Sequence, residues 1–153
     1  MPLFYRIVQA PWAVGALTGE GARLYGGRWN RVGIAAVYLA ETRSLAALEI
    51  LVHAPREALG LDWMVIEVEI PESLIDRVPH DRLPENWHRQ PSSKDAMAFG
   101  SRWLRDAPNL SLLLPSVVIP EENSLLLNPS HPGMNHLKPG KPRPFSFDPR
   151  LAV

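Results

Sequence analysis

The sequence predicts an α+β fold, a single compact domain of mixed strands with a few helices. Strand and helix patterns follow one another without the regular alternation that a doubly wound parallel sheet requires. The chain has 153 residues, enough for one domain with its own core, so we expect one domain over residues 1–153. Nine of the 16 prolines lie between Pro108 and Pro149, and proline lacks the amide donor of helix interiors and central strands. The C-terminal third should therefore be mostly strand and loop.

The N-terminal half contains two strand patterns and one helix pattern. Residues 3–8 alternate sufficiently to form a first strand, and the apolar run at 35–40 predicts a second. Thr42 can cap a helix that follows directly, because a threonine hydroxyl accepts from a free amide of the first turn. This helix should end near Ala54, since the residue before Pro55 avoids helical geometry.

The C-terminal half begins with the clearest strand, residues 62–70, in which Glu67 and Glu69 alternate with apolar residues and mark a solvated face. Residues 71–90 predict a connection with at most one helical turn. Residues 92–104 predict a helix that starts at Ser92. The remaining strand patterns are 110–120, interrupted at Pro115, then 124–127 and 143–147.

Composition excludes several classes of protein. The 16 basic and 16 acidic residues cancel, which argues against direct binding of nucleic acid. The chain has no cysteine, so disulfides and thiolate metal sites are excluded. No apolar stretch approaches the roughly 20 residues of a membrane span, and the N-terminus lacks the pattern of a secretory signal. We therefore expect a cytoplasmic protein without a membrane partner.

Common catalytic motifs are absent from the sequence. The five histidines show no metal-ligand spacing, so we expect no metal site. Ser116 follows Pro115 and lacks the glycines of a hydrolase nucleophile elbow. No phosphate-binding loop with Gly-Lys-Ser or Gly-Lys-Thr occurs, and no dinucleotide fingerprint follows a strand. Ordinary kinase and dehydrogenase activities are therefore not expected.

Glu49 is the most informative residue for chemistry. In the helix after Thr42, helical spacing places Glu49 within an apolar stripe of Leu45, Leu48 and Val52. Burying a carboxylate without compensation costs several kcal/mol, so Glu49 should either have a polar partner or line a cavity that a ligand fills.

The segment Gly26-Gly27-Arg28 and the aromatic Tyr38 offer two explanations for Glu49. Paired glycines let the backbone approach another group closely, and the guanidinium of Arg28 suits a phosphate or a carboxylate. Tyr38 supplies an aromatic face for the same cavity. Alternatively, Arg28 and Glu49 form a structural ion pair, and Tyr38 belongs to the core.

Arg6 and Ser116 are further candidates. Arg6 lies within the first strand, where its side chain faces either solvent or a pocket. Pro115 implies a bulge or an unpaired edge in its strand, and we expect either feature to expose the Ser116 hydroxyl to a cleft.

Taken in order, the motifs resemble the RES family, which is named for its arginine, glutamate and serine. The resemblance runs from about residue 3 to residue 132 and leaves a proline-rich C-terminal segment, residues 133–153. It implies a fold similar to ADP-ribosyltransferases of the diphtheria-toxin type. The motifs that carry it are Tyr5-Arg6-Ile7, Gly26-Gly27-Arg28-Trp29-Asn30 with Gly33, Tyr38-Leu39-Ala40, Ala47-Leu48-Glu49, Pro115-Ser116, Glu122-Asn123 and Asn128-Pro129-Ser130-His131-Pro132.

The resemblance also implies a function. The family is known as the toxin half of bacterial toxin–antitoxin pairs, with an Xre-type helix-turn-helix antitoxin as the partner. Its members consume NAD by phosphorolysis or hydrolysis, and some attach ADP-ribose to a protein. NAD would then be a substrate, with inorganic phosphate as an optional co-substrate and no prosthetic group. A homo-oligomer is compatible with this function.

By the same resemblance, the catalytic residues are Arg28, Glu49 and Ser116. The NAD-binding residues are Arg6, Arg28, Tyr38, Ser116 and Asn123. Two alternatives remain open, namely transfer of ADP-ribose to a host protein, and a non-enzymatic binding module in which the Arg28–Glu49 pair is structural.

Overall fold

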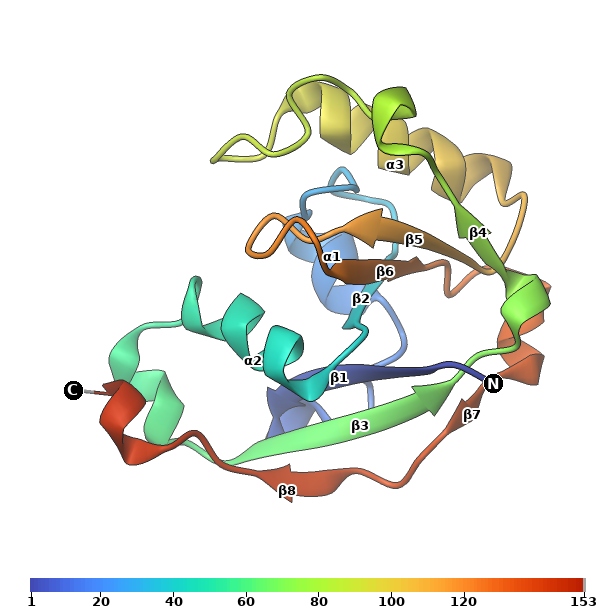
Figure 1. Cartoon of the computed structure of the whole chain (residues 1–153). Helices are drawn as coiled ribbons and strands as arrows, with labels where there is room; N and C mark the ends of the chain where they lie inside the picture. Colours follow the sequence, from blue (N-terminus) through green and yellow to red (C-terminus); the bar gives the residue numbers. More distant parts are fainter. Residues whose placement is uncertain (153) are drawn as a thin grey trace.

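A computed structural model, which describes residues 1–152, confirms the α+β class (Figure 1). One eight-stranded sheet has the order β4-β5-β6-β2-β1-β3-β7, and β8 also pairs with β3. Its neighbours are antiparallel except for the parallel pair β4–β5. The strands are β1 Leu3–Gln9, β2 Val37–Ala40, β3 Trp63–Glu69, β4 Ile75–Arg77, β5 Ser111–Pro115, β6 Asn123–Leu127, β7 Lys138–Pro139 and β8 Arg143–Phe145; the α-helices are α1 Glu20–Tyr25, α2 Arg43–Leu51 and α3 Lys94–Asp106.

The sheet splits between β1 and β2. These two strands pair only at Tyr5 and Ala40, whereas β1 pairs with β3 over its whole length, from Leu3 opposite Glu69 to Gln9 opposite Trp63. The sheet therefore forms two wings that diverge from this point, one with β1, β3, β7 and β8 and the other with β2, β6, β5 and β4 (Figure 1). A cavity lined by residues of β1 and β2 opens at this split.

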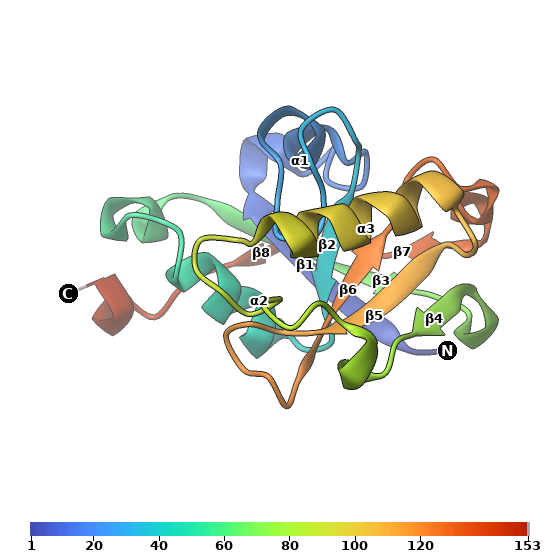
Figure 2. The same cartoon turned by 90° about the horizontal axis from the view of Figure 1, so that it is seen from above.

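Three apolar clusters fix the wings and helices. The first fills the space between the wings, where β1 and β3 face β2 and β6. The second packs α2 on the wing that contains β1 and β3. The third packs α3 across the wing that contains β2, β6 and β5, as Figure 2 shows from above. Representative members are Phe4, Val68 and Leu125 in the first cluster, Leu45, Trp63 and Phe147 in the second, and Ala96, Leu104 and Leu126 in the third.

Helix α2 forms as expected, although its buried face differs from the prediction. The Thr42 hydroxyl accepts from the Leu45 amide at 3.0 Å, which confirms the N-cap. Leu45 and Ala46 are buried, whereas Val52 is 57% exposed, so the stripe predicted from Leu45 to Val52 is wrong. The helix is apolar around most of its circumference, and its sequence therefore cannot show which face the sheet covers.

Two further expectations need correction. The connection at 71–90 contains strand β4, because Ile75 to Arg77 pair with β5. Helix α3 begins at Lys94 rather than at Ser92, because its N-cap is Ser93, whose hydroxyl accepts from the Ala96 amide at 3.1 Å. As expected, residues after Pro108 form strands, loops and short 3₁₀ turns.

Gly100 lets α3 approach the loop after α1. A Cβ at this position would lie 1.9 Å from the Trp29 carbonyl oxygen, and backbone at that distance cannot move aside cheaply. We expect Gly100→Ala to lower the free energy of unfolding by about 3 kcal/mol despite the better helix propensity of alanine. Urea unfolding measures this loss. Gly21→Ala in α1 is the control, since a Cβ added there would meet no atom within 4 Å other than its chain neighbours and its own helix backbone. An equal loss in both variants would contradict the packing argument.

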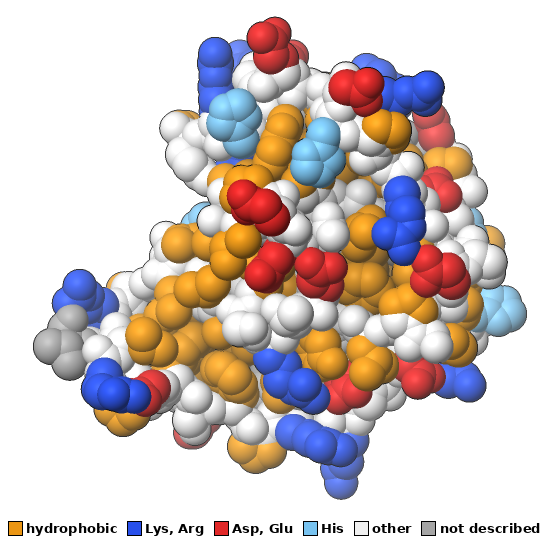
Figure 3. All heavy atoms as spheres, in the orientation of Figure 1, with side chains coloured by type: hydrophobic (Ala, Val, Ile, Leu, Met, Phe, Trp, Pro, Cys, Tyr) orange, Lys and Arg blue, Asp and Glu red, His pale blue; other side chains and the backbone are white. Residues whose placement is uncertain are grey.

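The visible surface carries charges of both signs. Figure 3 shows Lys and Arg side chains interspersed with Asp and Glu side chains over this face. Among the helices of residues 1–152, none combines the length and apolar composition that crossing a membrane requires.

Candidate active site

A cavity of about 770 Å³, here called the cleft, opens where β1 and β2 part. Its walls come from β1, β2 and α2, from α1 with the turn after it, and from the segment before α3. Four of the residues predicted from the sequence line it together: Arg6, Arg28, Tyr38 and Glu49.

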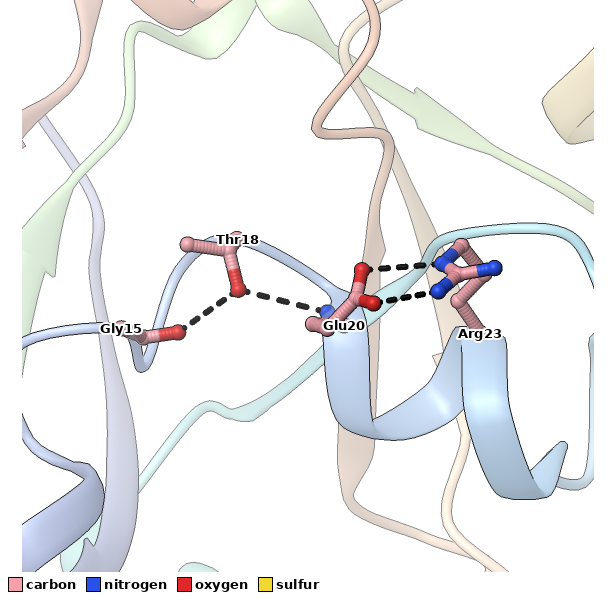
Figure 4. Close-up of polar contacts among 4 residues, drawn as sticks. All are labelled: Gly15, Thr18, Glu20 and Arg23. Atoms are coloured by element: carbon pink, nitrogen blue, oxygen red, sulfur yellow. Dashed lines mark hydrogen bonds and ion pairs between the residues drawn. The ribbon is translucent and has the colours of Figure 1, made fainter.

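Helix α1 forms one wall. The Thr18 hydroxyl bonds the Gly15 carbonyl and accepts from the Glu20 amide, and the Glu20 carboxylate pairs with Arg23 within the helix (Figure 4). These contacts organise the helix start, so that Gly21 faces the cleft from its first turn.

The turn after α1 requires glycine at two positions. Gly26 ends the helix with a φ of 76°, a left-handed conformation that favours glycine. A Cβ on Gly27 would lie 2.7 Å from the Tyr38 hydroxyl oxygen. The paired glycines therefore permit the close approach expected from the sequence, and the group approached is the Tyr38 side chain.

Tyr38 is anchored through its hydroxyl. This hydroxyl donates to Asn30 Oδ1 at 2.6 Å and accepts from the Trp29 amide at 3.0 Å. Asn30 is fully buried, and its Nδ2 donates to the carbonyls of Ala22 and Ile34 at 2.9 Å each. Because the hydroxyl is engaged by the loop, the aromatic ring is the part of Tyr38 that remains for a ligand. Asn30 is the last residue of the motif Gly26-Gly27-Arg28-Trp29-Asn30, but that motif did not indicate that Asn30 anchors the Tyr38 hydroxyl.

Burial raises the pKa of Tyr38, and the nearby Trp29 amide and Arg28 guanidinium offset part of this effect. The folded pKa then exceeds the unfolded value of about 10, so this contribution to stability is complete below about pH 10 and is lost as the pH rises toward the folded pKa. Above about pH 10, the free energy of unfolding of the wild-type protein should fall more steeply with pH than that of Tyr38→Phe. The difference in slope should be up to about 1.4 kcal/mol per pH unit. Urea unfolding between pH 9 and 11 tests this, and equal slopes in the two proteins would contradict it.

Arg6 bridges the split in the sheet. Its Nη1 donates to the Tyr38 carbonyl at 3.0 Å, which links the two strands where their ladder has ended. Its Nε is buried and has no hydrogen-bond partner within residues 1–152. Burial lowers the pKa of Arg6, but a guanidinium remains charged at neutral pH. The pocket alternative for Arg6 is thus the one observed, and its charge is available to an anionic ligand.

Arg28 does not form the structural ion pair with Glu49. Its Nη1 donates to the carbonyls of Trp87 at 3.0 Å and Arg89 at 2.7 Å, which fastens the segment before α3 to the cleft. Burial lowers the pKa of Arg28, and the charge of Glu49 acts in the opposite direction at longer range. The ion pairs within residues 1–152 join other residues, namely Arg23–Glu20, Arg43–Glu67, Arg77–Glu72 and Arg150–Asp148.

Ser116 holds the Glu49 carboxylate. Its Oγ donates to Glu49 Oε1 at 2.8 Å and accepts from the amides of Val118 at 3.0 Å and Ile119 at 3.2 Å. Because two amides occupy the acceptor side of Oγ, its single hydrogen is directed to Glu49. Ser116 is 1% exposed, so the expectation that its hydroxyl faces the cleft is wrong. Glu49 Oε2 has no hydrogen-bond partner within the described residues.

Asn123 lies away from the cleft wall. Its backbone amide donates to Glu41 Oε1 at 2.8 Å, and its Nδ2 donates to Glu41 Oε2 at 3.3 Å. The structure therefore places Asn123 in the junction of β2 with β6, where its partner is Glu41, a residue that no sequence motif indicated. Within residues 1–152, no three His, Cys, Asp or Glu side chains gather as a metal site.

The fold and the cleft define a class of protein, namely an α+β domain with a split sheet. Its cleft suits an anionic ligand that also carries a hydrogen-bond donor for the Glu49 carboxylate. Comparison with known families gives a match to the RES domain over residues 3–148. The chain therefore belongs to the RES domain family.

Relatives in this family are toxins. Toxin Res of Yersinia enterocolitica is 41% identical over 150 residues, which cover 97% of this chain and 99% of that protein. The Prs ADP-ribosylating toxin of a Sphingobium species is 40% identical over 138 residues, 88% of this chain and 86% of that protein. A chain in the crystal structure of the M. tuberculosis MbcT–MbcA toxin–antitoxin complex has the same fold, with a TM-score of 0.75 and 22% identity over 98% of this chain and 86% of that chain.

Proposed function

We propose that this protein is the toxin of a toxin–antitoxin pair and that it degrades NAD by cleaving the bond between nicotinamide and ribose. The observation that carries the proposal is Glu49, whose Oε1 is fixed by Ser116 while the residue lines a cleft with two arginines. A carboxylate held in this way is preorganised to bind the ribose, because it needs no rearrangement when the ligand enters.

The remaining residues suit the rest of NAD. Arg6 and Arg28 offer two guanidinium groups for the diphosphate, and charge-assisted hydrogen bonds to phosphate are among the strong ones. The ring of Tyr38 suits stacking with nicotinamide. A cleft of about 770 Å³ also lies within the usual range for ligand sites, roughly 300–1,000 Å³.

Glu49 would act on the charge that develops during cleavage. As the C1″–N bond breaks, its electron pair moves to the pyridinium nitrogen, and the ribose gains oxocarbenium-like positive charge. A carboxylate bonded to a ribose hydroxyl stabilises this charge more than it stabilises bound NAD, so it lowers the barrier. Water or inorganic phosphate then captures C1″.

A second candidate is transfer of ADP-ribose to a protein. The relative at 40% identity that is named as a Prs ADP-ribosylating toxin favours it, since the same cleavage would precede that transfer. The non-enzymatic alternative loses its main support, because the Arg28–Glu49 ion pair on which it depended is not formed.

An Xre-type helix-turn-helix antitoxin is the proposed partner. The fold match to a chain of the MbcT–MbcA toxin–antitoxin complex supports an antitoxin of some kind. The cytoplasm is the proposed location, because it holds the NAD that such a toxin would consume.

Purified protein incubated with NAD tests the proposal. We expect release of nicotinamide, with ADP-ribose as the second product in phosphate-free buffer and a phosphorylated ADP-ribose when phosphate is the acceptor. Labelled NAD in a cell lysate separates the second candidate, since only protein transfer yields a labelled protein band. Intact NAD in every reaction, with a protein shown to be folded by its cooperative unfolding, would refute both.

A further inference from the structure

His53 lies four residues after Glu49, just beyond the end of α2. Its backbone amide donates to the Ile50 carbonyl at 3.0 Å, so the chain still turns helically at this point. Residues four apart on a helical turn project from the same side, with Cβ atoms about 5–6 Å apart. Glu49, Ile50 and His53 all line the cleft. The imidazole therefore faces the same space as the carboxylate, one turn further along.

The imidazole of His53 makes no hydrogen bond or ion pair within residues 1–152. Every other ionisable side chain of the cleft already has a partner in the fold or a part in the proposed binding of NAD. Arg6, Arg28, Tyr38 and Glu49 are described above, and the Tyr5 ring carries the Arg43 guanidinium at 4.4 Å. His53 is exposed and remains as the ionisable group of this wall that has no assigned task.

We propose that His53 binds the acceptor oxygen that captures C1″, an inference that rests on the proposed NAD cleavage. Glu49 bonds the ribose, so a group one helical turn away reaches an acceptor that approaches the same sugar. His53 follows the C-terminal end of α2, and Ala54, Pro55 and Ala58, which come next along the chain, also line the cleft. This exposed end of the cleft admits water or phosphate while NAD occupies the end near Arg28.

The imidazole serves the two acceptors differently. When water is the acceptor, its oxygen bonds to C1″, the C1″–N electron pair leaves with nicotinamide, and one water proton passes to His53. When hydrogen phosphate is the acceptor, its oxygen bonds to C1″ without losing a proton, and His53 donates a hydrogen bond to another phosphate oxygen. The side chain is thus a proton acceptor for hydrolysis and a hydrogen-bond donor for phosphorolysis.

The test is acceptor kinetics with two variants of the full chain. In His53→Ala, we expect the rate in phosphate-free buffer to fall at least tenfold and the KM for phosphate to rise about tenfold, with the KM for NAD within twofold of wild type. In His53→Gln, the amide retains a donor but takes no proton, so the KM for phosphate should recover while the hydrolysis rate stays low. A histidine with only a structural role would not separate the two acceptors.

His136→Ala is the matched control, since His136 is exposed and lies outside the cleft, and it should leave both rates unchanged. Wild-type acceptor kinetics in His53→Ala would overturn the inference, as would a parallel change in the KM for NAD and for phosphate. Wild-type protein that leaves NAD intact would instead refute the proposed function, so the two failures are distinguishable.

Discussion

Glu49→Gln should reduce nicotinamide release about 10²- to 10³-fold, because the amide cannot stabilise the positive charge on the ribose in the transition state. The fold should persist, since the amide oxygen can still accept from the Ser116 hydroxyl. We expect the free energy of unfolding to change by less than about 1 kcal/mol. Steady-state kinetics with NAD, together with urea unfolding, measure both quantities.

Glu67→Gln provides the control for Glu49→Gln. Glu67 is also half-buried, but its partner is Arg43 at 2.9 Å and it lies outside the cleft. This variant should retain wild-type turnover. If Glu49→Gln kept most of its activity while remaining folded, Glu49 would not be the group that stabilises the ribose.

Ser116→Ala should lower turnover about 10- to 100-fold while the KM for NAD stays within about threefold of wild type. Ser116 is buried behind Glu49, so its removal leaves the carboxylate without its donor and does not remove a contact with the substrate. This makes Ser116 a positioning residue. The sequence resemblance had implied that Ser116 binds NAD directly, and direct binding would raise the KM for NAD instead.

A double-mutant cycle distinguishes the two roles. If Ser116 acts only through Glu49, then Ser116→Ala should cause almost no further loss of turnover in the Glu49→Gln protein. Independent losses that multiply would show that Ser116 acts on the substrate or on the fold.

Ser111→Ala controls for the loss of a buried serine. Ser111 is fully buried on β5, and its Oγ donates to the Leu74 carbonyl at 2.8 Å. Both serine variants should lower the free energy of unfolding by about 1–3 kcal/mol, since each leaves buried polar groups unpaired. Only Ser116→Ala should also reduce turnover, so a similar kinetic loss in Ser111→Ala would attribute the effect to general destabilisation.

Local sequence was sufficient for elements whose signals are short-range. The alternation at 3–8 and 62–70 predicted β1 and β3, and Thr42 predicted the start of α2, because a cap and a pleated face depend on residues only a few positions apart. Strand β4 was missed because it has three residues and exists through pairing with β5, which lies more than 30 residues further along the chain. A pattern of three residues carries too little periodicity to predict a strand.

For the candidate site, too, the sequence predicted some features and not others. The ordered motifs pointed to Arg6, Arg28, Tyr38 and Glu49, and the structure brings these four side chains to one cleft. Their partners could not be predicted, because hydrogen bonds depend on which groups the fold places within about 3 Å. The bond between Ser116 and Glu49 spans 67 residues.

By itself, the sequence determined that this protein is an α+β domain of the RES family and which residue types its chemistry can use, since composition and ordered motifs are properties of the chain alone. Only the tertiary structure decided that β1 and β2 part after a single residue pair, that Ser116 supports Glu49 from behind, and that Asn123 bonds Glu41. The physical reason is that a side chain's neighbours are set by packing between distant segments, and the geometry of that packing is not encoded in any local pattern.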